Sequence, residues 1–111
     1  RRDRLLVQRV HELLRMRPED AHTGESIARA LHVSSRTLHR QLQEEGAALQ
    51  ALKDEVRRER AIELLNRTSR PIKQVALAVG FLNEKSFSRA FKQWTGTPPE
   101  SFREYGRHFG A

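Results

Sequence analysis

The sequence predicts an all-α fold of seven helices, and three observations lead to this prediction. Apolar residues recur three or four positions apart along almost the whole chain, the spacing of one face of an amphipathic helix. No segment of four or more residues alternates apolar and polar side chains in the way a half-buried strand does. Residue types that begin or end helices, such as Ser, Asn, Gly and Pro, fall between the apolar runs. The chain is therefore expected to pack helix against helix.

The N-terminal part of the chain contains three predicted helices. The first spans about residues 3 to 16, with Asp3 as its candidate N-cap. Thr23 and Ser34 are suited to cap two shorter helices, because a hydroxyl oxygen accepts a hydrogen bond from a backbone amide of the first turn. The third helix is expected to end near Gly46.

A longer amphipathic helix is predicted from Leu49 to about Asn66. Its second face is rich in Arg and Glu. For each of these charges, a solvated face laced with salt bridges is the preferred interpretation.

Three more helices follow the central one. Pro71 is suited to open the fifth helix, which Gly80 ends. Asn83 is expected to cap the sixth, which ends near Gly96, and a last short helix begins at residues 98–99. The inward side chains of the sixth helix are aromatic: Phe87, Phe91 and Trp94.

One local plan occurs twice in the chain. Residues 27–33 and 75–81 both contain a small Ala, three further residues, a turn residue and an apolar residue. A helix-turn-helix needs these features: a small residue where two helices cross, a tight turn, and an apolar residue behind it. His32 stands where the second copy has Gly80, so His32 is expected in a left-handed or slightly different backbone conformation. The second copy is one residue longer.

The helix after each turn presents polar side chains opposite its apolar face. On the third helix, with Leu38 and Leu42 inward, the outward residues are Arg36, His39, Arg40 and Gln43. On the sixth helix they are Lys85, Ser88, Arg89 and Lys92, with Glu84 at the helix start. Arg can bind guanine through two hydrogen bonds, and Lys, His and Ser can bind bases or phosphates. For each single Arg, a phosphate contact or an idle surface charge is an equally good interpretation.

The composition favours a polyanionic partner. Lys and Arg outnumber Asp and Glu by 21 to 14, a formal charge of +7. Charge alone also suits RNA or an anionic membrane, so it does not decide the partner. The chain contains no cysteine, which excludes disulfides and thiolate metal sites and fits a reducing cytoplasm. No apolar run is long enough to span a membrane, and no membrane partner, cofactor or metal is expected.

The predicted length of the central helix suggests how the third and sixth helices contact one DNA site together. About 18 residues at 1.5 Å each give a rod of ~27 Å. Successive major grooves on one face of DNA lie about 34 Å apart. One monomer is therefore expected to place its two recognition helices in adjacent major grooves.

Two ordered stretches of the chain resemble the DNA-binding domain of the arabinose-regulator (AraC/XylS) family. The first runs from Ser26 through Ser34, Ser35, Arg36 and Leu42 to Gly46. The second is more specific and comprises residues 72–81, 86–92, Trp94-Thr95-Gly96, Pro99 and Phe102-Arg103. The resemblance covers nearly the whole chain. Pro98 departs from the family pattern, which often has a capping Ser there.

The resemblance implies two helix-turn-helix subdomains, at residues 1–48 and 68–111, joined by a linker helix at 49–67. Recognition helices are implied at about 35 to 45 and 84 to 95. Base-reading roles are implied for Arg36, His39, Arg40, Lys85 and Arg89, and more weakly for Ser35, Gln43, Glu84, Ser88 and Lys92.

The family also implies partners and a larger protein. The expected activity is sequence-specific binding of double-stranded DNA by a bacterial transcription regulator, an activator that contacts RNA polymerase. A small-molecule effector is expected to act only through an N-terminal effector or dimerisation domain that is absent from this chain. The fragment itself is expected to be monomeric.

Three other functions are compatible with parts of the sequence. An enzyme is disfavoured, because the five histidines do not cluster, form no metal-binding motif and accompany no Gly-rich phosphate loop. A base-stacking platform for single strands is disfavoured, because the helical spacing of the aromatic residues places them in a core. A helical protein-interaction module without DNA binding remains the more serious alternative. No catalytic residue is expected.

Overall fold

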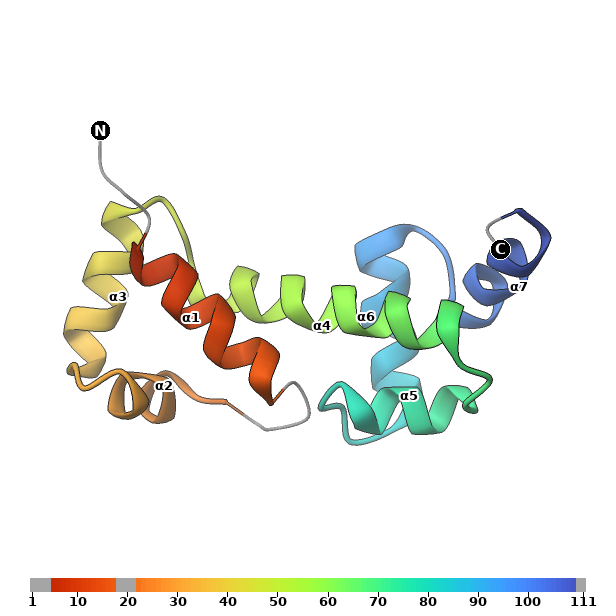
Figure 1. The fold of residues 1–111 in the computed structure, drawn as a ribbon, viewed down its shortest axis with the longest axis horizontal. Helices are drawn as coiled ribbons and strands as arrows, with labels where there is room; N and C mark the ends of the chain where they lie inside the picture. The colour runs from red at the N-terminus through yellow and green to blue at the C-terminus, as the bar shows by residue number, and fades with distance from the viewer. Residues whose placement is uncertain (1–4, 18–21, 110–111) are drawn as a thin grey trace. The chain divides into compact units, whose positions relative to one another are not determined.

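The computed structural model describes residues 5–17 and 22–109, and over these residues it contains seven α-helices and no strand (Figure 1). The helices are α1 (Leu5–Met16), α2 (Gly24–Ala30), α3 (Ser35–Glu44), α4 (Leu49–Arg67), α5 (Ile72–Ala78), α6 (Glu84–Thr95) and α7 (Pro99–Phe109). The all-α prediction is therefore confirmed. The chain divides into two compact units, residues 1–56 and 57–111, and the division falls within α4.

The first unit packs α1, α2, α3 and the first half of α4 around one apolar core. Its fully or almost fully buried residues include Val10, Leu14, Ile27, Ala28, Leu38, Leu42 and Val56. These are the positions that helical periodicity directs inward. The helix predicted as a separate linker thus supplies part of this core through Leu52 and Val56.

A carboxylate from another helix end caps α1. The two carboxylate oxygens of Glu45 accept hydrogen bonds from the backbone amides of Leu6 and Val7, at 3.2 and 2.9 Å. These amides belong to the first turn of α1, where no intrahelical acceptor is available and the helix dipole favours negative charge. Asp3, the N-cap predicted from the sequence, lies outside the described residues. Glu45 follows α3 directly, so this cap ties the start of α1 to the end of α3.

The second unit packs the rest of α4 against α5, α6 and α7. Its buried residues include Ala61, Leu64, Leu65, Val75, Ala76, Val79, Phe87 and Phe91. The aromatic rings contact one another edge to face: the centroids of Phe81 and Phe87 lie 5.6 Å apart, and those of Phe91 and Phe102 lie 5.2 Å apart. Such contacts add to the stabilisation from burial itself. The aromatic residues therefore form a core, as the sequence predicts.

The last helix differs from the prediction. α7 runs from Pro99 to Phe109, so it is an 11-residue helix and not the short helix expected. Pro98 contributes its backbone carbonyl, which accepts from the Phe102 amide at 2.9 Å. This is the ordinary first hydrogen bond of a helix, and Pro98 has no side-chain acceptor at the position where many relatives have a capping Ser.

Candidate nucleic-acid interface

The two turns that precede α3 and α6 share one backbone arrangement. The amide of Val33 donates to the Ala28 carbonyl at 3.0 Å, and the amide of Phe81 donates to the Ala76 carbonyl at 3.0 Å. His32 has φ 60°, and Gly80, at the equivalent position, has φ 91°. The left-handed conformation predicted for His32 is therefore confirmed, at a position where a side chain other than Gly costs free energy.

Each turn is closed by a side-chain cap at the start of the following helix. Ser34 accepts from the Thr37 amide at 3.0 Å, and Asn83 accepts from the Ser86 amide at 2.8 Å. Thr23 caps α2 in a capping box with Ser26. These three caps are as predicted, and they fix the residue at which each helix begins.

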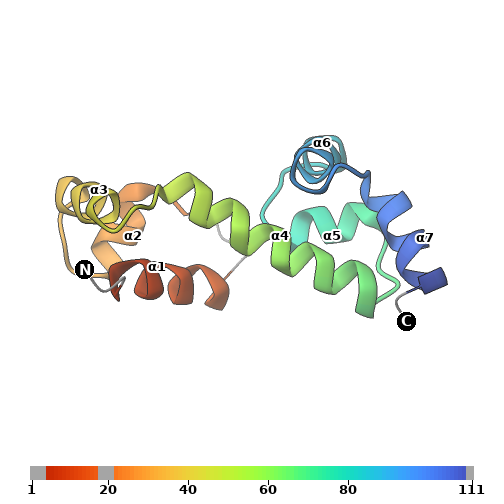
Figure 2. The ribbon, with the colours of Figure 1, turned by 90° about the horizontal axis from the view of Figure 1, so that it is seen from above.

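Within each unit the two helices of the motif cross steeply. Figure 1 shows α6 upright above α5, and Figure 2 shows α6 end-on while α5 still lies along the page. The pair α2 and α3 is arranged in the same way (Figures 1 and 2). The crossing leaves the outer face of α3 and the outer face of α6 uncovered by the first helix of its own motif.

The face of α3 opposite its core residues carries the predicted polar side chains. Leu38 and Leu42 are 0% and 1% exposed, and they fix which side of the helix faces inward. The opposite face is exposed at Arg36, His39, Arg40 and Gln43, and Ser35 at the helix start is half-buried. The structure therefore brings the polar residues predicted for the first recognition helix, α3, onto one face.

One of the two arginines on this face has a partner among the described residues of the unit, and the other does not. Arg40 forms an ion pair with Glu44 at 3.2 Å, between side chains that are 57% and 41% exposed. An exposed pair one helical turn apart is worth a few tenths of a kcal/mol, so Arg40 can exchange it for another acceptor at little cost. Arg36 has no hydrogen bond or ion pair with any residue that the structure describes.

The His39 side chain is oriented by a hydrogen bond and by packing within the first unit. Its Nδ1 lies 2.9 Å from the Ser35 carbonyl, and since a carbonyl can only accept, Nδ1 carries the hydrogen. The imidazole also packs against α2, where a Cβ added to Gly24 would lie 3.0 Å from its Cε1 atom. In the neutral ring, Nε2 is then an acceptor. The packing orients the ring before any ligand arrives.

The outer face of α6 is similar but carries an acidic residue at its start. Phe87 and Phe91 are 0% exposed, and Lys85, Arg89 and Lys92 are exposed on the other side, with Ser88 half-buried. Lys85 and Arg89 form no hydrogen bond or ion pair with other residues in the described part of the chain. Both cations are thus available to an added anion.

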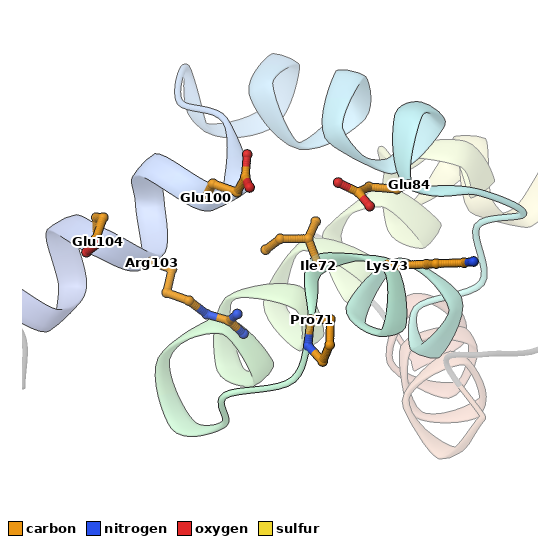
Figure 3. Close-up of a pocket in the computed structure, with 7 residues that line it drawn as sticks. All are labelled: Pro71, Ile72, Lys73, Glu84, Glu100, Arg103 and Glu104. Atoms are coloured by element: carbon orange, nitrogen blue, oxygen red, sulfur yellow. The ribbon is translucent and has the colours of Figure 1, made fainter.

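Glu84 lies at the start of α6, before this row of cations. It lines a cavity of about 490 Å³ beside Pro71, Ile72, Lys73, Glu100, Arg103 and Glu104. Figure 3 shows the carboxylates of Glu84 and Glu100 directed toward the same space above Ile72. Glu84 also lies in the first turn of α6, where a negative charge stabilises the helix.

The sequence did not predict the structural contacts of two basic residues in the second unit, Arg57 and Arg103. The guanidinium of Arg57 lies 5.0 Å from the ring centroid of Phe81. Arg103 donates to the carbonyls of Leu65 and Arg70, at 3.1 and 2.7 Å. A cation stacked on an aromatic ring or bonded to the end of α4 stabilises the fold. These contacts join residues 24 to 38 positions apart, so no local spacing in the sequence announces them.

Comparisons with known proteins agree with this arrangement. A family model described as a helix-turn-helix domain matches residues 27–105. The ornithine utilization regulator of Pseudomonas aeruginosa is 41% identical over 99 residues, which cover 89% of this chain and 29% of that protein. The chain therefore spans under a third of the length of this curated relative.

Solved structures share the fold over almost the whole chain. A DNA-binding transcriptional dual regulator from Escherichia coli K-12 has a TM-score of 0.89 and 26% identity, with 93% of each chain covered. A regulator from Chromobacterium violaceum with an AraC-type DNA-binding domain has a TM-score of 0.84 and 28% identity, with 96% of each chain covered. The DNA-binding domain of AdpA, solved in complex with a target DNA, shares the fold at 24% identity, with a TM-score of 0.80 and 92% of this chain and 93% of that chain covered.

These findings exclude the enzyme class, since the family consists of DNA-binding regulators. Among the described residues, no helix is both long enough and apolar enough to cross a membrane. The matched family model, the curated relative and the solved structures together identify the chain as a member of the AraC-type helix-turn-helix family of DNA-binding transcription regulators.

Proposed function

We propose that this chain binds double-stranded DNA in a sequence-specific manner by inserting α3 and α6 into the major groove. One observation carries the proposal: the motif is duplicated, and each copy presents a row of polar and cationic side chains opposite a fully buried apolar face. A major groove admits one α-helix, and the polar edges of its bases match such side chains.

The first unit supplies most of the sequence choice in this proposal. Arg36 and Arg40 each present a guanidinium, whose geometry suits O6 and N7 of guanine. His39 adds an oriented imidazole whose free Nε2 accepts a hydrogen bond from a base amino group. Ser35 and Gln43 lie at the edges of this face and make secondary contacts.

The second unit supplies mainly contacts to the phosphate backbone. Lys85 and Arg89 are exposed cations without internal partners among the described residues, with Ser88 and Lys92 beside them. Glu84 is assigned to the helix terminus and not to DNA, because its carboxylate is directed toward Glu100 in Figure 3. A carboxylate at the groove would repel phosphate.

The two recognition helices are proposed to occupy adjacent major grooves of one site, so that a monomer of this chain suffices for binding. We also propose, from the family resemblance, that an N-terminal effector or dimerisation domain belongs to the whole protein; the Pseudomonas relative is longer than this chain, which covers 29% of it. Activation through contact with RNA polymerase, in the cytoplasm, completes the proposal.

The test has two stages. Duplexes bound by the chain are first selected from a random pool, and affinity for the selected duplex is then measured by fluorescence anisotropy at several salt concentrations. Binding that neutralises several phosphates makes the logarithm of the association constant fall steeply with the logarithm of salt concentration. Single strands and scrambled duplexes should compete poorly at physiological salt.

The opposite results would support the protein-interaction alternative. A selection that returns no preferred sequence, together with an affinity that does not respond to salt, would overturn DNA binding by this chain. Strong competition by single strands would instead overturn the groove-reading part alone.

A further inference from the structure

The second helix-turn-helix contains one residue more than the first, and the structure shows where it lies. In both copies the apolar residue behind the turn makes the same backbone hydrogen bond, from Val33 to Ala28 and from Phe81 to Ala76. Downstream, each N-cap precedes its first buried residue by four positions: Ser34 precedes Leu38, and Asn83 precedes Phe87. Val33 is followed directly by its cap, whereas Leu82 separates Phe81 from Asn83. Leu82 is therefore the inserted residue.

This inserted residue is the most exposed large apolar side chain in the described part of the protein. Leu82 is 92% exposed, whereas Leu77, on the preceding helix, is 49% exposed. The apolar core of the unit is closed without it, since Phe81, Phe87 and Phe91 pack against one another. Leu82 therefore adds nothing to the apolar core of the unit, and its side chain is accessible to a binding partner.

The position of Leu82 in the second helix-turn-helix favours a contact with the major groove of DNA. Leu82 stands directly before the N-cap of α6, and the N-terminal residues of a recognition helix are those that contact base edges. The exposed cations Lys85 and Arg89 follow on the first two turns of α6, and the proposed function assigns them mainly to the phosphate backbone. The major groove offers one apolar feature, the C5 methyl group of thymine.

We propose that Leu82 contacts a thymine methyl group and so determines sequence preference at the second half-site. The proposal rests on the proposed insertion of α6 into the major groove. It assigns the second unit an apolar reading element that the first unit lacks, because Ser34 follows Val33 without an intervening residue.

The experiment removes the methyl group without altering base pairing. Each thymine of the duplex selected by the wild-type chain is replaced in turn by deoxyuridine, and affinities are measured for the wild type, Leu82→Ala and Leu82→Met. We expect one deoxyuridine substitution to weaken wild-type binding about fourfold, the equivalent of one buried methyl group. Leu82→Ala should bind the thymine and deoxyuridine duplexes equally, and Leu82→Met, which keeps an apolar side chain of similar size, should retain most of the discrimination.

Leu77→Ala is the matched control, because it removes an exposed leucine from the preceding helix of the same motif. It should leave the deoxyuridine penalty unchanged. Thermal unfolding of all variants checks that the exposed substitutions leave the fold intact.

Three results would overturn the proposal. Wild-type binding that is insensitive to deoxyuridine at every thymine would show that no methyl group is read, and so would a selected site without thymine. A penalty that persists in full in Leu82→Ala would assign the reading to another residue. In each of these cases sequence-specific duplex binding survives, whereas failure of the proposed function would appear as the absence of any selected duplex.

Discussion

Phe87→Ala is expected to destabilise the second unit strongly. Phe87 is 0% exposed, and its ring centroid lies 5.6 Å from that of Phe81 and 5.7 Å from that of Phe91. Truncating a fully buried Phe costs ~3 to 5 kcal/mol through lost burial and the cavity left behind. The loss of the two aromatic contacts is part of this cost, and we expect a value near the middle of the range, about 4 kcal/mol.

The single tryptophan allows the effect to be assigned to the second unit. Trp94 is the only Trp in the chain, and its ring lies 5.9 Å from that of Phe81. Urea denaturation followed by Trp94 fluorescence therefore reports on this core, while far-UV circular dichroism reports on both units. A loss of about 4 kcal/mol can unfold a unit of this size altogether, so Phe87→Leu, with an expected loss of ~1 to 2 kcal/mol, provides a measurable second variant.

Lys85→Ala is the control on the same helix. Lys85 is exposed, so its truncation should change the free energy of unfolding by less than ~0.5 kcal/mol. The reasoning would be refuted if Phe87→Ala left the fluorescence transition unchanged and reduced only DNA binding. Phe87 would then belong to the contact surface.

Two further substitutions test the turns and caps. Glu45→Ala should lower the free energy of unfolding of the first unit by ~1 to 3 kcal/mol, because it removes a charged acceptor from the Leu6 and Val7 amides; an unchanged circular-dichroism transition would contradict this role. His32→Gly should raise the melting temperature, with a gain of up to ~1 kcal/mol from relieving the left-handed backbone, and a fall in melting temperature would show that the His32 side chain contributes more than its conformation costs.

The parts of the fold that local chemistry determines were predictable from the sequence. Ser34 and Asn83 act on amides three residues away, so their capping roles follow from residue type and position. His32 was predicted to be left-handed because the repeat aligns it with Gly80. The inward and outward faces of α3 and α6 follow from helical periodicity alone.

The parts that depend on tertiary packing were not predictable. The Glu45 cap joins residues 38 and 39 positions apart, and the Arg103 contact to Leu65 also spans 38 positions. Neither contact follows from the local spacing of residues around Glu45 or Arg103, because its partner lies far away along the chain. The direction of Glu84, toward Glu100 on α7, likewise depends on where α7 packs within its unit.

If exposed arginines of the two recognition helices contact DNA in different ways, their substitution should affect sequence preference differently. Affinities of Arg40→Ala, Arg89→Ala and Arg67→Ala are measured on the selected duplex, on its single-base variants and on a scrambled duplex. Arg67→Ala is the matched control, since Arg67, like Arg40, is an exposed arginine one helical turn from a glutamate partner, Glu63 at 3.8 Å.

Arg40→Ala should cost ~1 to 3 kcal/mol on the selected duplex and flatten the preference at one or two base pairs. Arg89→Ala should weaken the selected and scrambled duplexes to a similar extent, and Arg67→Ala should leave the preference intact. If Arg40→Ala instead weakened all duplexes equally, while Arg89→Ala removed discrimination within its own half-site, the assignment of base reading to α3 and backbone contact to Arg89 would be contradicted.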